Sequence, residues 1–275
     1  MGSYQLLFFR IYGKVNSGCE TFCFTDYSQE RRLSSMNPET FIAQCAAHGL
    51  VLNDQQIAQF ERYFQLLVEW NEKMNLTAIT QREEVYLKHF YDCLMALWNM
   101  PLDNYALQLC DVGAGAGFPS IPLKIAHPEL QVTIVDSLQK RLTFIDHLAQ
   151  ELGLEGVFCV HGRAEDVGQN PVYRGQFDLV TARAVASLNV LAEYCLPLVK
   201  IGGQFLALKA QKSDQELEEA GAAIRVLGAK LIKVTEDQLP VESADRRYIL
   251  IQKTKETPNK YPRKAGKPAK NPIKA

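Results

Sequence analysis

From about residue 106 onward, short apolar runs alternate with helical segments, and this alternation restricts the possible fold more than any other feature. Seven runs have the length and apolar content of strands, at 106–112, 132–135, 157–160, 177–181, 204–208, 231–234 and 248–252. Helical patterns lie between them at 119–126, 139–152, 190–199 and 213–227. Strands that alternate with helices form βαβ units. We therefore expect an α/β fold, a seven-stranded, mostly parallel, Rossmann-like sheet with helices on both faces, over residues 101–252.

The two ends of this region depart from the alternation. No helical pattern connects the last two strands, so residues 235–247 predict an antiparallel hairpin that closes the sheet. Residues 36–100 carry helical patterns at 39–48, 54–71 and 82–98 and predict an N-terminal helical extension. We expect this extension either to cover one face of the sheet or to help to recognise a partner.

Residues 1–35 show neither helical nor strand periodicity, so we expect a disordered or non-native extension there, with Met36 as the natural start. Residues 253–275 hold eight Lys or Arg and one acid, Glu256, and contain four prolines. We expect a disordered basic tail. A cationic tail on an acidic body is typical of a protein with a polyanionic partner, although a solvated end that aids solubility has the same composition.

Composition excludes several classes of protein. No apolar run approaches the ~18–20 residues that a bilayer span requires, and no signal peptide is recognisable. The seven cysteines form no CxxC pair, so neither a disulfide framework nor a metal site is indicated. We expect a cytoplasmic protein.

Three glycines at alternate positions, Gly113, Gly115 and Gly117, follow the first strand and precede a helix. Glycine allows a sharp turn and a close approach of the backbone to a ligand. The pattern is GxGxG, and Phe118 stands where the dinucleotide fingerprint requires a small residue. An apolar wall at this turn favours a ligand without phosphates, although a glycine turn can also serve only to pack a helix on a strand.

Acidic residues follow or precede the predicted turns of the sheet. Asp111 can accept a hydrogen bond from a cationic amine, and Asp136 can accept hydrogen bonds from both hydroxyls of a ribose. The segment 163–166, after the third strand, can hold an adenine amino group. An adenosine with a positive, non-phosphorylated substituent fits this set, and S-adenosylmethionine is such a molecule.

If the ligand is S-adenosylmethionine, which is a methyl donor, the fourth strand indicates which kind of acceptor atom receives the methyl group. Residues 181–184 (TARA) lack the Asn or Asp with Pro-Pro and an aromatic residue that orients exocyclic amines. Cys195, in the following helix, is expected to be a buried small hydrophobe rather than a nucleophile. A ring nitrogen with a free lone pair, such as guanine N7, needs no general base. Arg183 can hold the cofactor carboxylate, the guanine O6 or a phosphate, or form a structural ion pair.

Several stretches together resemble one known family. They include DVGAGAGFP at 111–119 and KYPRK at 260–264, with further matches at 70–77, 88–93, 136–141, 181–184 and 207–209. In these stretches the chain is similar to the ribosomal RNA small subunit methyltransferase G (glucose-inhibited division protein B) family, over about residues 36–275. One departure is Cys93, where relatives usually have Ser.

This resemblance implies a bacterial enzyme that uses S-adenosylmethionine to methylate N7 of a guanine in the 530 loop of 16S rRNA. The cofactor-binding residues that the motifs and the resemblance indicate are Gly113, Gly115, Phe118, Asp136, Ala164, Glu165 and Arg183. The candidates for RNA binding are Arg163, Lys209 and Arg246. We expect a monomer that acts on the small ribosomal subunit. A nicotinamide-dependent dehydrogenase and a non-catalytic RNA-binding assembly factor are the alternatives.

Overall fold

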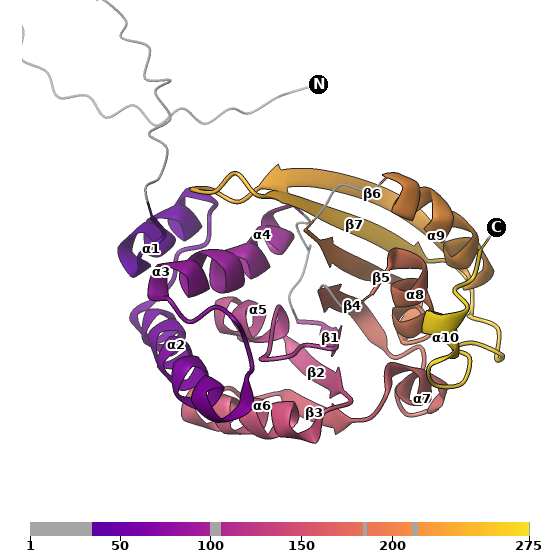
Figure 1. Ribbon diagram of the computed structural model, residues 1–275, viewed down its shortest axis with the longest axis horizontal. Helices are drawn as coiled ribbons and strands as arrows, with labels where there is room; N and C mark the ends of the chain where they lie inside the picture. Colours follow the sequence, from indigo (N-terminus) through magenta and orange to yellow (C-terminus); the bar gives the residue numbers. More distant parts are fainter. Residues whose placement is uncertain (1–34, 100–105, 184–185, 211–213, 275) are drawn as a thin grey trace, which may run out of the picture. The chain divides into compact units, whose positions relative to one another are not determined.

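A computed structural model describes residues 35–99, 106–183, 186–210 and 214–274. In these ranges, seven strands form one sheet in the order β3-β2-β1-β4-β5-β7-β6 (Figure 1). The strands are β1 (Gln108–Val112), β2 (Gln131–Asp136), β3 (Val157–His161), β4 (Phe177–Arg183), β5 (Val199–Lys209), β6 (Ala229–Gln238) and β7 (Asp245–Lys253). Strands β1 to β5 pair in parallel, and β7 pairs antiparallel with both β5 and β6. The predicted α/β fold and its terminal hairpin are confirmed.

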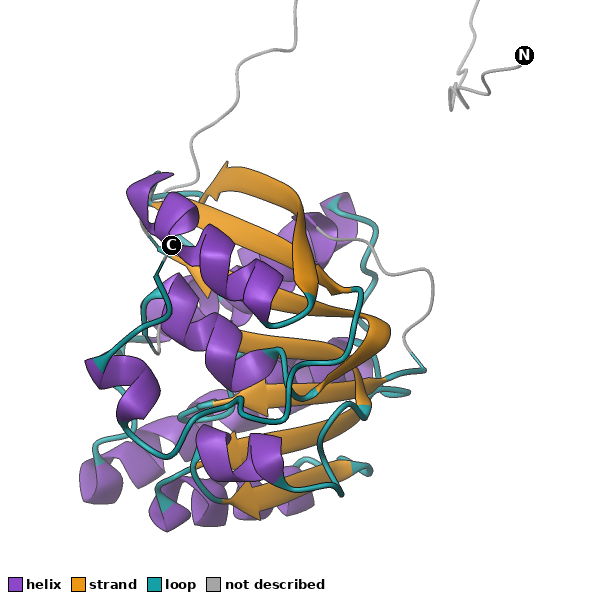
Figure 2. Ribbon diagram, turned by 90° about the vertical axis from the view of Figure 1, so that its right-hand side faces the viewer, coloured by secondary structure: helices purple, strands orange, loops and turns teal. Residues whose placement is uncertain are grey.

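Helices lie on both sides of this sheet (Figure 2). The N-terminal helices are α1 (Pro38–Ala47), α2 (Asp54–Met74), α3 (Arg82–Val85), the π-helical segment η1 (Tyr86–Tyr91) and α4 (Asp92–Asn99). The others are α5 (Ser120–Ala126), α6 (Gln139–Glu151), α7 (Ala164–Gln169), α8 (Leu188–Cys195), α9 (Asp214–Val226) and α10 (Lys267–Lys270). The sequence predicts one helix over 82–98, whereas the structure divides it by a π-helical turn, a feature often found at functional sites.

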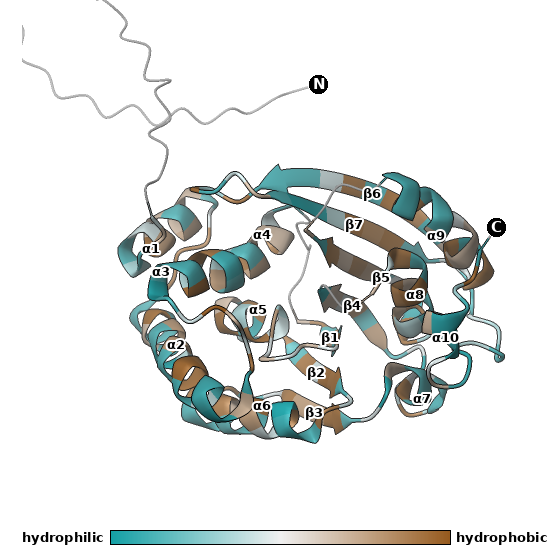
Figure 3. Ribbon diagram, viewed as in Figure 1, coloured by the Kyte–Doolittle hydropathy of each residue, from teal (hydrophilic) through white to brown (hydrophobic). Residues whose placement is uncertain are grey.

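Successive side chains of a strand point to opposite faces of the sheet and so belong to two separate hydrophobic clusters. In β5, Leu206 and Leu208 face the cluster that contains the N-terminal helices, α5 and α6. Phe205 and Ala207 face the cluster formed with α8 and α9. Figure 3 shows the hydrophobic residues that run along the strands. Because neighbouring residues of a strand point to opposite faces, a strand buried on both sides is apolar throughout, which explains why the interior strands β1, β2 and β4 are recognisable from sequence.

The N-terminal helical extension covers one face of the sheet. Asn37 caps α1 by accepting a hydrogen bond from Thr40 N at 2.8 Å. Asn53 and Gln56 form a capping box at the start of α2. The Gln56 side chain also donates to the carbonyl of Ile125 in α5 at 2.7 Å, which ties the two helices together. The extension and the sheet therefore share one core.

The C-terminal segment is held against the domain, which differs from the expected disordered tail. Arg174 donates to the carbonyls of Thr257 at 2.7 Å and Tyr261 at 2.8 Å. Gln169 donates to the carbonyl of Pro262, whose ring is buried. Side chains of the domain thus satisfy backbone carbonyls that regular structure would otherwise satisfy. The prolines do prevent long regular elements, but they do not prevent packing.

Two further expectations concern membranes and cysteines. Across the described ranges, no helix has the length and apolarity to cross a bilayer. Cys195 is fully buried with a free thiol, as expected of a small core residue. Residues 1–34 of the predicted extension 1–35, which include two of the seven cysteines, Cys19 and Cys23, lie outside the described residues.

Candidate functional site

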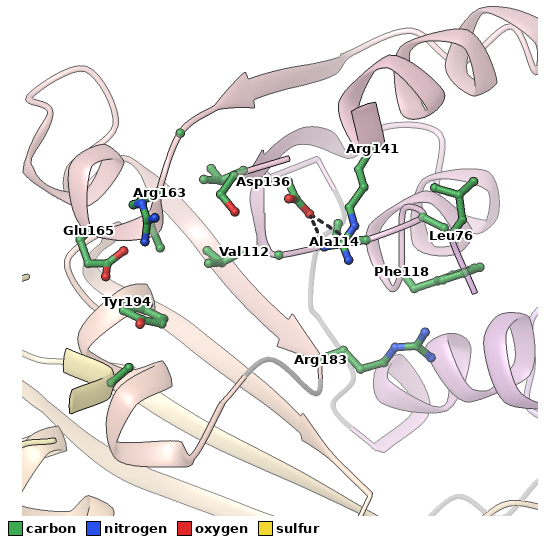
Figure 4. A pocket seen from close by; sticks show the side chains of 18 of the residues that line it. Leu76, Val112, Ala114, Phe118, Asp136, Arg141, Arg163, Glu165, Arg183 and Tyr194 are labelled. Atoms are coloured by element: carbon green, nitrogen blue, oxygen red, sulfur yellow. Dashed lines mark hydrogen bonds and ion pairs between the residues drawn. The ribbon is translucent and has the colours of Figure 1, made fainter. Parts of the chain in front are cut away.

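A cavity of about 590 Å³ lies at the carboxyl ends of β1, β2 and β3. This position is where open α/β sheets bind ligands. The cavity is lined by all the predicted cofactor residues, which are Gly113, Gly115, Phe118, Asp136, Ala164, Glu165 and Arg183. Figure 4 shows Glu165, Arg163 and Tyr194 near one end of it, and Phe118, Leu76 and Arg183 near the other.

The glycine turn forms the floor of this cavity. Gly113, Gly115 and Gly117 have φ values of +76°, +62° and +98°, a region that other residues rarely adopt. At Gly117 space is also restricted, because a Cβ would lie 2.9 Å from the Tyr63 hydroxyl and 2.8 Å from Cγ1 of Ile121. The sequence pattern thus reflects both backbone conformation and packing.

Asp136 is held in one orientation at the end of β2. Its Oδ1 accepts a hydrogen bond from Leu138 N at 2.9 Å. Its Oδ2 lies 3.3 Å from Arg141 NH1 and 3.4 Å from Gly115 N. Arg141, in the first turn of α6, also lines the cavity and was not singled out from the sequence. A fixed carboxylate here can accept hydrogen bonds from ribose hydroxyls.

Phe118 is part of an aromatic stack. Its ring lies 5.4 Å from that of Tyr63 and 4.4 Å from that of His89, nearly parallel to both. The Arg183 guanidinium carbon lies 5.0 Å from the Phe118 ring centroid, within cation–π range. The expected apolar wall is therefore a supported stack rather than a single mobile ring.

His89 of η1 lines the cavity and was also missed in the sequence. Its Nε2 lies 2.9 Å from Thr77 Oγ1. Burial, together with the nearby Arg183 charge, lowers the pKa of His89 to about 3. The ring is therefore neutral at neutral pH and is a very weak base.

Asp111 does not reach the cavity, so the expectation that it contacts a ligand amine is wrong. The residue is fully buried, and its Oδ2 accepts a hydrogen bond from Ser120 N at 3.1 Å. It therefore holds the start of α5 behind the glycine turn. Burial raises the pKa of Asp111 to about 7.

Glu165 of α7 lies at the end of the cavity opposite Phe118 (Figure 4). Its side chain is nearly buried, and its Oε1 accepts a hydrogen bond from Gly266 N at 2.8 Å. Tyr194, Gly266 and Ala269 line the same cavity. None of these three was predicted. Tyr194 comes from α8, whose packing beside α7 the sequence does not show, and Gly266 and Ala269 come from the segment expected to be disordered.

A second cavity of about 240 Å³ adjoins the first and shares His89 and Arg183 with it. Two of the three RNA-binding candidates, Lys209 and Arg246, line this second cavity, while Arg163 lines the first. Asp92 connects the arginines, because its carboxylate lies 2.6 Å from Arg246 Nε and 3.4 Å from Arg183 NH1.

Lys209 is also held by neighbours, since its Nζ lies 2.8 Å from Glu216 Oε1 and donates to the Ala186 carbonyl at 2.9 Å. No group of three or more His, Cys, Asp or Glu in the described parts of the chain has an arrangement that could hold a metal ion.

Comparison with known proteins gives strong matches. A family model described as rRNA small subunit methyltransferase G matches residues 56–244. A protein of Exiguobacterium sibiricum called ribosomal RNA small subunit methyltransferase G is 56% identical over 238 residues, covering 86% of this chain and 100% of that protein. The protein of the same name from Lactobacillus acidophilus is 57% identical over 239 residues, with the same coverage of both chains. Among solved structures, the antibiotic-resistance methyltransferase Kmr aligns with 18% identity and a TM-score of 0.46, over 61% of this chain and 93% of that one.

Proposed function

Because the chain belongs to the rRNA small subunit methyltransferase G family, we propose that it transfers the methyl group of S-adenosylmethionine to N7 of a guanine in the 530 loop of 16S rRNA. One observation carries the proposal for this site. The cavity at the glycine turn adjoins a smaller cavity, and the two share Arg183 and His89. A cofactor in the first cavity would present its methyl group to a base in the second.

The residues of the larger cavity fit S-adenosylmethionine. Asp136 offers acceptors for the ribose hydroxyls, and Glu165 with Ala164 lies where the adenine would be held. Gly113 and Gly115 allow the backbone to approach the ligand closely. Arg183, at the opposite end from Glu165, can bind the methionine carboxylate or the guanine O6.

When bound, the cofactor supplies an electrophilic methyl group. Transfer forms an N7–carbon bond with the lone pair of N7, while the sulfur keeps the electron pair of the broken sulfur–carbon bond. N7 carries no proton, so no base is required. A reaction that needs no base is compatible with this site, because His89 has a pKa of about 3 and is a very weak base. The protein contributes orientation, because Phe118 and Asp92 fix Arg183 at the boundary between the cavities.

The partner of this reaction is 16S rRNA or the small ribosomal subunit. Arg163 lies exposed at the rim of the cofactor cavity, where it can contact a phosphate. Lys209 and Arg246 line the smaller cavity, where the RNA would enter. We place the protein in the cytoplasm, where its substrate is, and expect it to act as a monomer.

Two measurements test the proposal. Calorimetry should detect binding of S-adenosylmethionine to the protein and no binding to Gly113→Val, because a β-branched side chain is strained at a φ of +76°. Incubation of small subunits from a strain that lacks the enzyme with labelled cofactor should then yield 7-methylguanosine after digestion of the RNA.

The alternatives give different results. A dehydrogenase would bind a nicotinamide cofactor in preference to S-adenosylmethionine. An assembly factor without catalytic activity would bind the subunit and transfer no label. Label at any nucleoside other than 7-methylguanosine would refute the proposed acceptor.

A further inference from the structure

We propose that residues 258–270, here called the C-terminal strap, form a wall of the cofactor cavity at its adenine end, and that cofactor affinity depends on this wall. The inference rests on the proposed function, since it takes the larger cavity as the S-adenosylmethionine site. It gives the strap a role that its composition does not suggest, because a basic, proline-rich segment is typical of a flexible arm.

The first argument is contact with the cavity. Gly266 and Ala269 of the strap both line it. The Gly266 amide donates to Oε1 of Glu165 at 2.8 Å, so the strap also fixes the carboxylate proposed to lie beside the adenine. Figure 1 shows α10 beside α8, the helix that contributes Tyr194 to the same end of the cavity.

The second argument is that the strap is bound to the domain by a buried ion pair. Glu193 of α8 has an exposed fraction of 0%. Its Oε2 lies 2.6 Å from Arg263 NH2, and its Oε1 accepts from both Nε and the backbone N of Arg263 at 2.8 Å. A carboxylate that is fully removed from water requires such partners, because an unpaired buried charge is strongly unfavourable. The domain thus contains a buried carboxylate, that of Glu193, which binds the strap through Arg263.

The third argument is close packing. A Cβ on Gly168 of α7 would lie 2.9 Å from Cγ of Pro262, so this glycine leaves room for the strap. Gln169 donates to the Pro262 carbonyl at 2.8 Å and to the Asn259 carbonyl at 3.1 Å. Both α7 and α8 are therefore built to hold this segment at the edge of the cavity.

The lysines of the strap are exposed and can still meet RNA phosphates. A wall and an RNA-binding arm make different predictions, however. A wall changes the affinity for the cofactor when no RNA is present, whereas an arm changes only the affinity for RNA and its dependence on salt.

The principal test is a chain that ends after Lys264. It keeps Arg263, so Glu193 stays paired, but it loses Gly266 and Ala269. In calorimetry without RNA, we expect the Kd of S-adenosylmethionine to rise at least tenfold. The Kd of methylthioadenosine, which has the adenosine part but no amino acid, should rise by a similar factor because the lost wall faces the adenine.

A charge-matched control separates the two roles. The full-length variant Lys267→Gln/Lys270→Gln/Lys274→Gln loses the same three lysines and keeps the wall. It should bind the cofactor as the unaltered protein does, and it should bind RNA with a weaker salt dependence. Equal loss of cofactor affinity in this variant and in the shortened chain would overturn the proposal.

A second pair of variants covers the case in which the shortened chain does not fold. Ala269→Trp places a bulky side chain at the cavity, and Ala265→Trp places the same side chain at an exposed strap position outside the cavity lining. We expect at least a tenfold rise in the cofactor Kd for the first and little change for the second. Unchanged binding by Ala269→Trp overturns the inference, while failure of the unaltered protein to bind S-adenosylmethionine overturns the proposed function itself.

Discussion

Asp92 accepts a hydrogen bond from Arg246 Nε at 2.6 Å, across 154 residues of sequence. The same carboxylate lies 3.4 Å from Arg183 NH1. Asp92 is almost fully buried at the start of α4, so one carboxylate neutralises two arginines that line the smaller cavity. This relationship, rather than either arginine alone, defines the boundary between the two cavities.

Asp92→Asn should therefore lower methyl transfer at least tenfold. The amide keeps the shape of the side chain but leaves two guanidinium groups without a counter-charge, at a cost of about 1.5–3 kcal/mol in unfolding free energy. Initial rates and urea unfolding measure both effects. Glu242→Gln is the control, because it removes the exposed partner of Lys88, and exposed pairs contribute little. Equal behaviour of the two variants would contradict the assigned role.

The glycine turn gives a matched pair of stability predictions. Gly115→Ala should lower the free energy of unfolding by about 1 kcal/mol, because alanine disfavours the positive φ at this position. No steric cost is added, since nothing lies within 4 Å of a Cβ there. Gly117→Ala should cost about 1–3 kcal/mol more, because its Cβ would overlap Tyr63 and Ile121. Denaturant unfolding without cofactor measures the difference. A smaller loss at Gly117 than at Gly115 would show that the packing at the turn is not as described.

Asp111 predicts a specific pH dependence of stability. Its folded pKa, about 7, lies above the ordinary value of 3.8, so folding favours the protonated form. Its contribution is therefore complete below about pH 4 and is lost as the pH rises to about 7, by about 4 kcal/mol in total. Asp111→Asn cannot ionise. The unfolding free energy of this variant, relative to that of the unaltered protein, should increase as the pH rises from 4.5 to 7.5.

Urea unfolding at several pH values measures this gain. Asp166→Asn, at an exposed position of α7, serves as the control and should follow the unaltered protein at each pH. A constant difference between Asp111→Asn and the unaltered protein across this range would mean that Asp111 is ionised throughout.

Two RNA-binding candidates should behave differently. The side chain of Arg163 belongs to an exposed residue and makes no hydrogen bond or ion pair with any residue that the structure describes, so the guanidinium is available to a phosphate. Arg163→Gln should make the slope of log affinity against log salt less negative by about 0.7. Lys209→Gln should leave the slope nearly unchanged, because Lys209 is held by Glu216 and the Ala186 carbonyl. Filter binding with 16S rRNA at several salt concentrations distinguishes them.

The interior strands β1, β2 and β4 could be predicted because they are buried on both faces and so appear as apolar runs. The edge strands β3 and β6 contain apolar runs as well, although much of each strand is exposed. The glycine turn and Asp136 were also predictable, since strand, turn and helix are adjacent in sequence. Helices α7 and α10 were missed because six and four residues are too few to show a helical period.

The missed site residues depend on contacts that no local pattern encodes. Gly266 meets Glu165 across 101 residues, and Tyr194 reaches the cavity only because α8 packs beside α7. The strap was misread for the same reason. Its composition is that of a flexible segment, but Arg263 has a buried partner, Glu193, that sequence alone does not reveal. Asp111 was misplaced because its position before the turn does not show that Ser120 covers it.

Thr77 and Ala269 line one cavity although 192 positions separate them in the chain. The residues that complete this cavity from the strap lie C-terminal to every strand and are synthesised after them. A polypeptide that ended at β7 would thus lack Gly266 and Ala269, and with them one side of the cavity. The growing polypeptide can enclose a ligand there only once its last helical turn has left the ribosome.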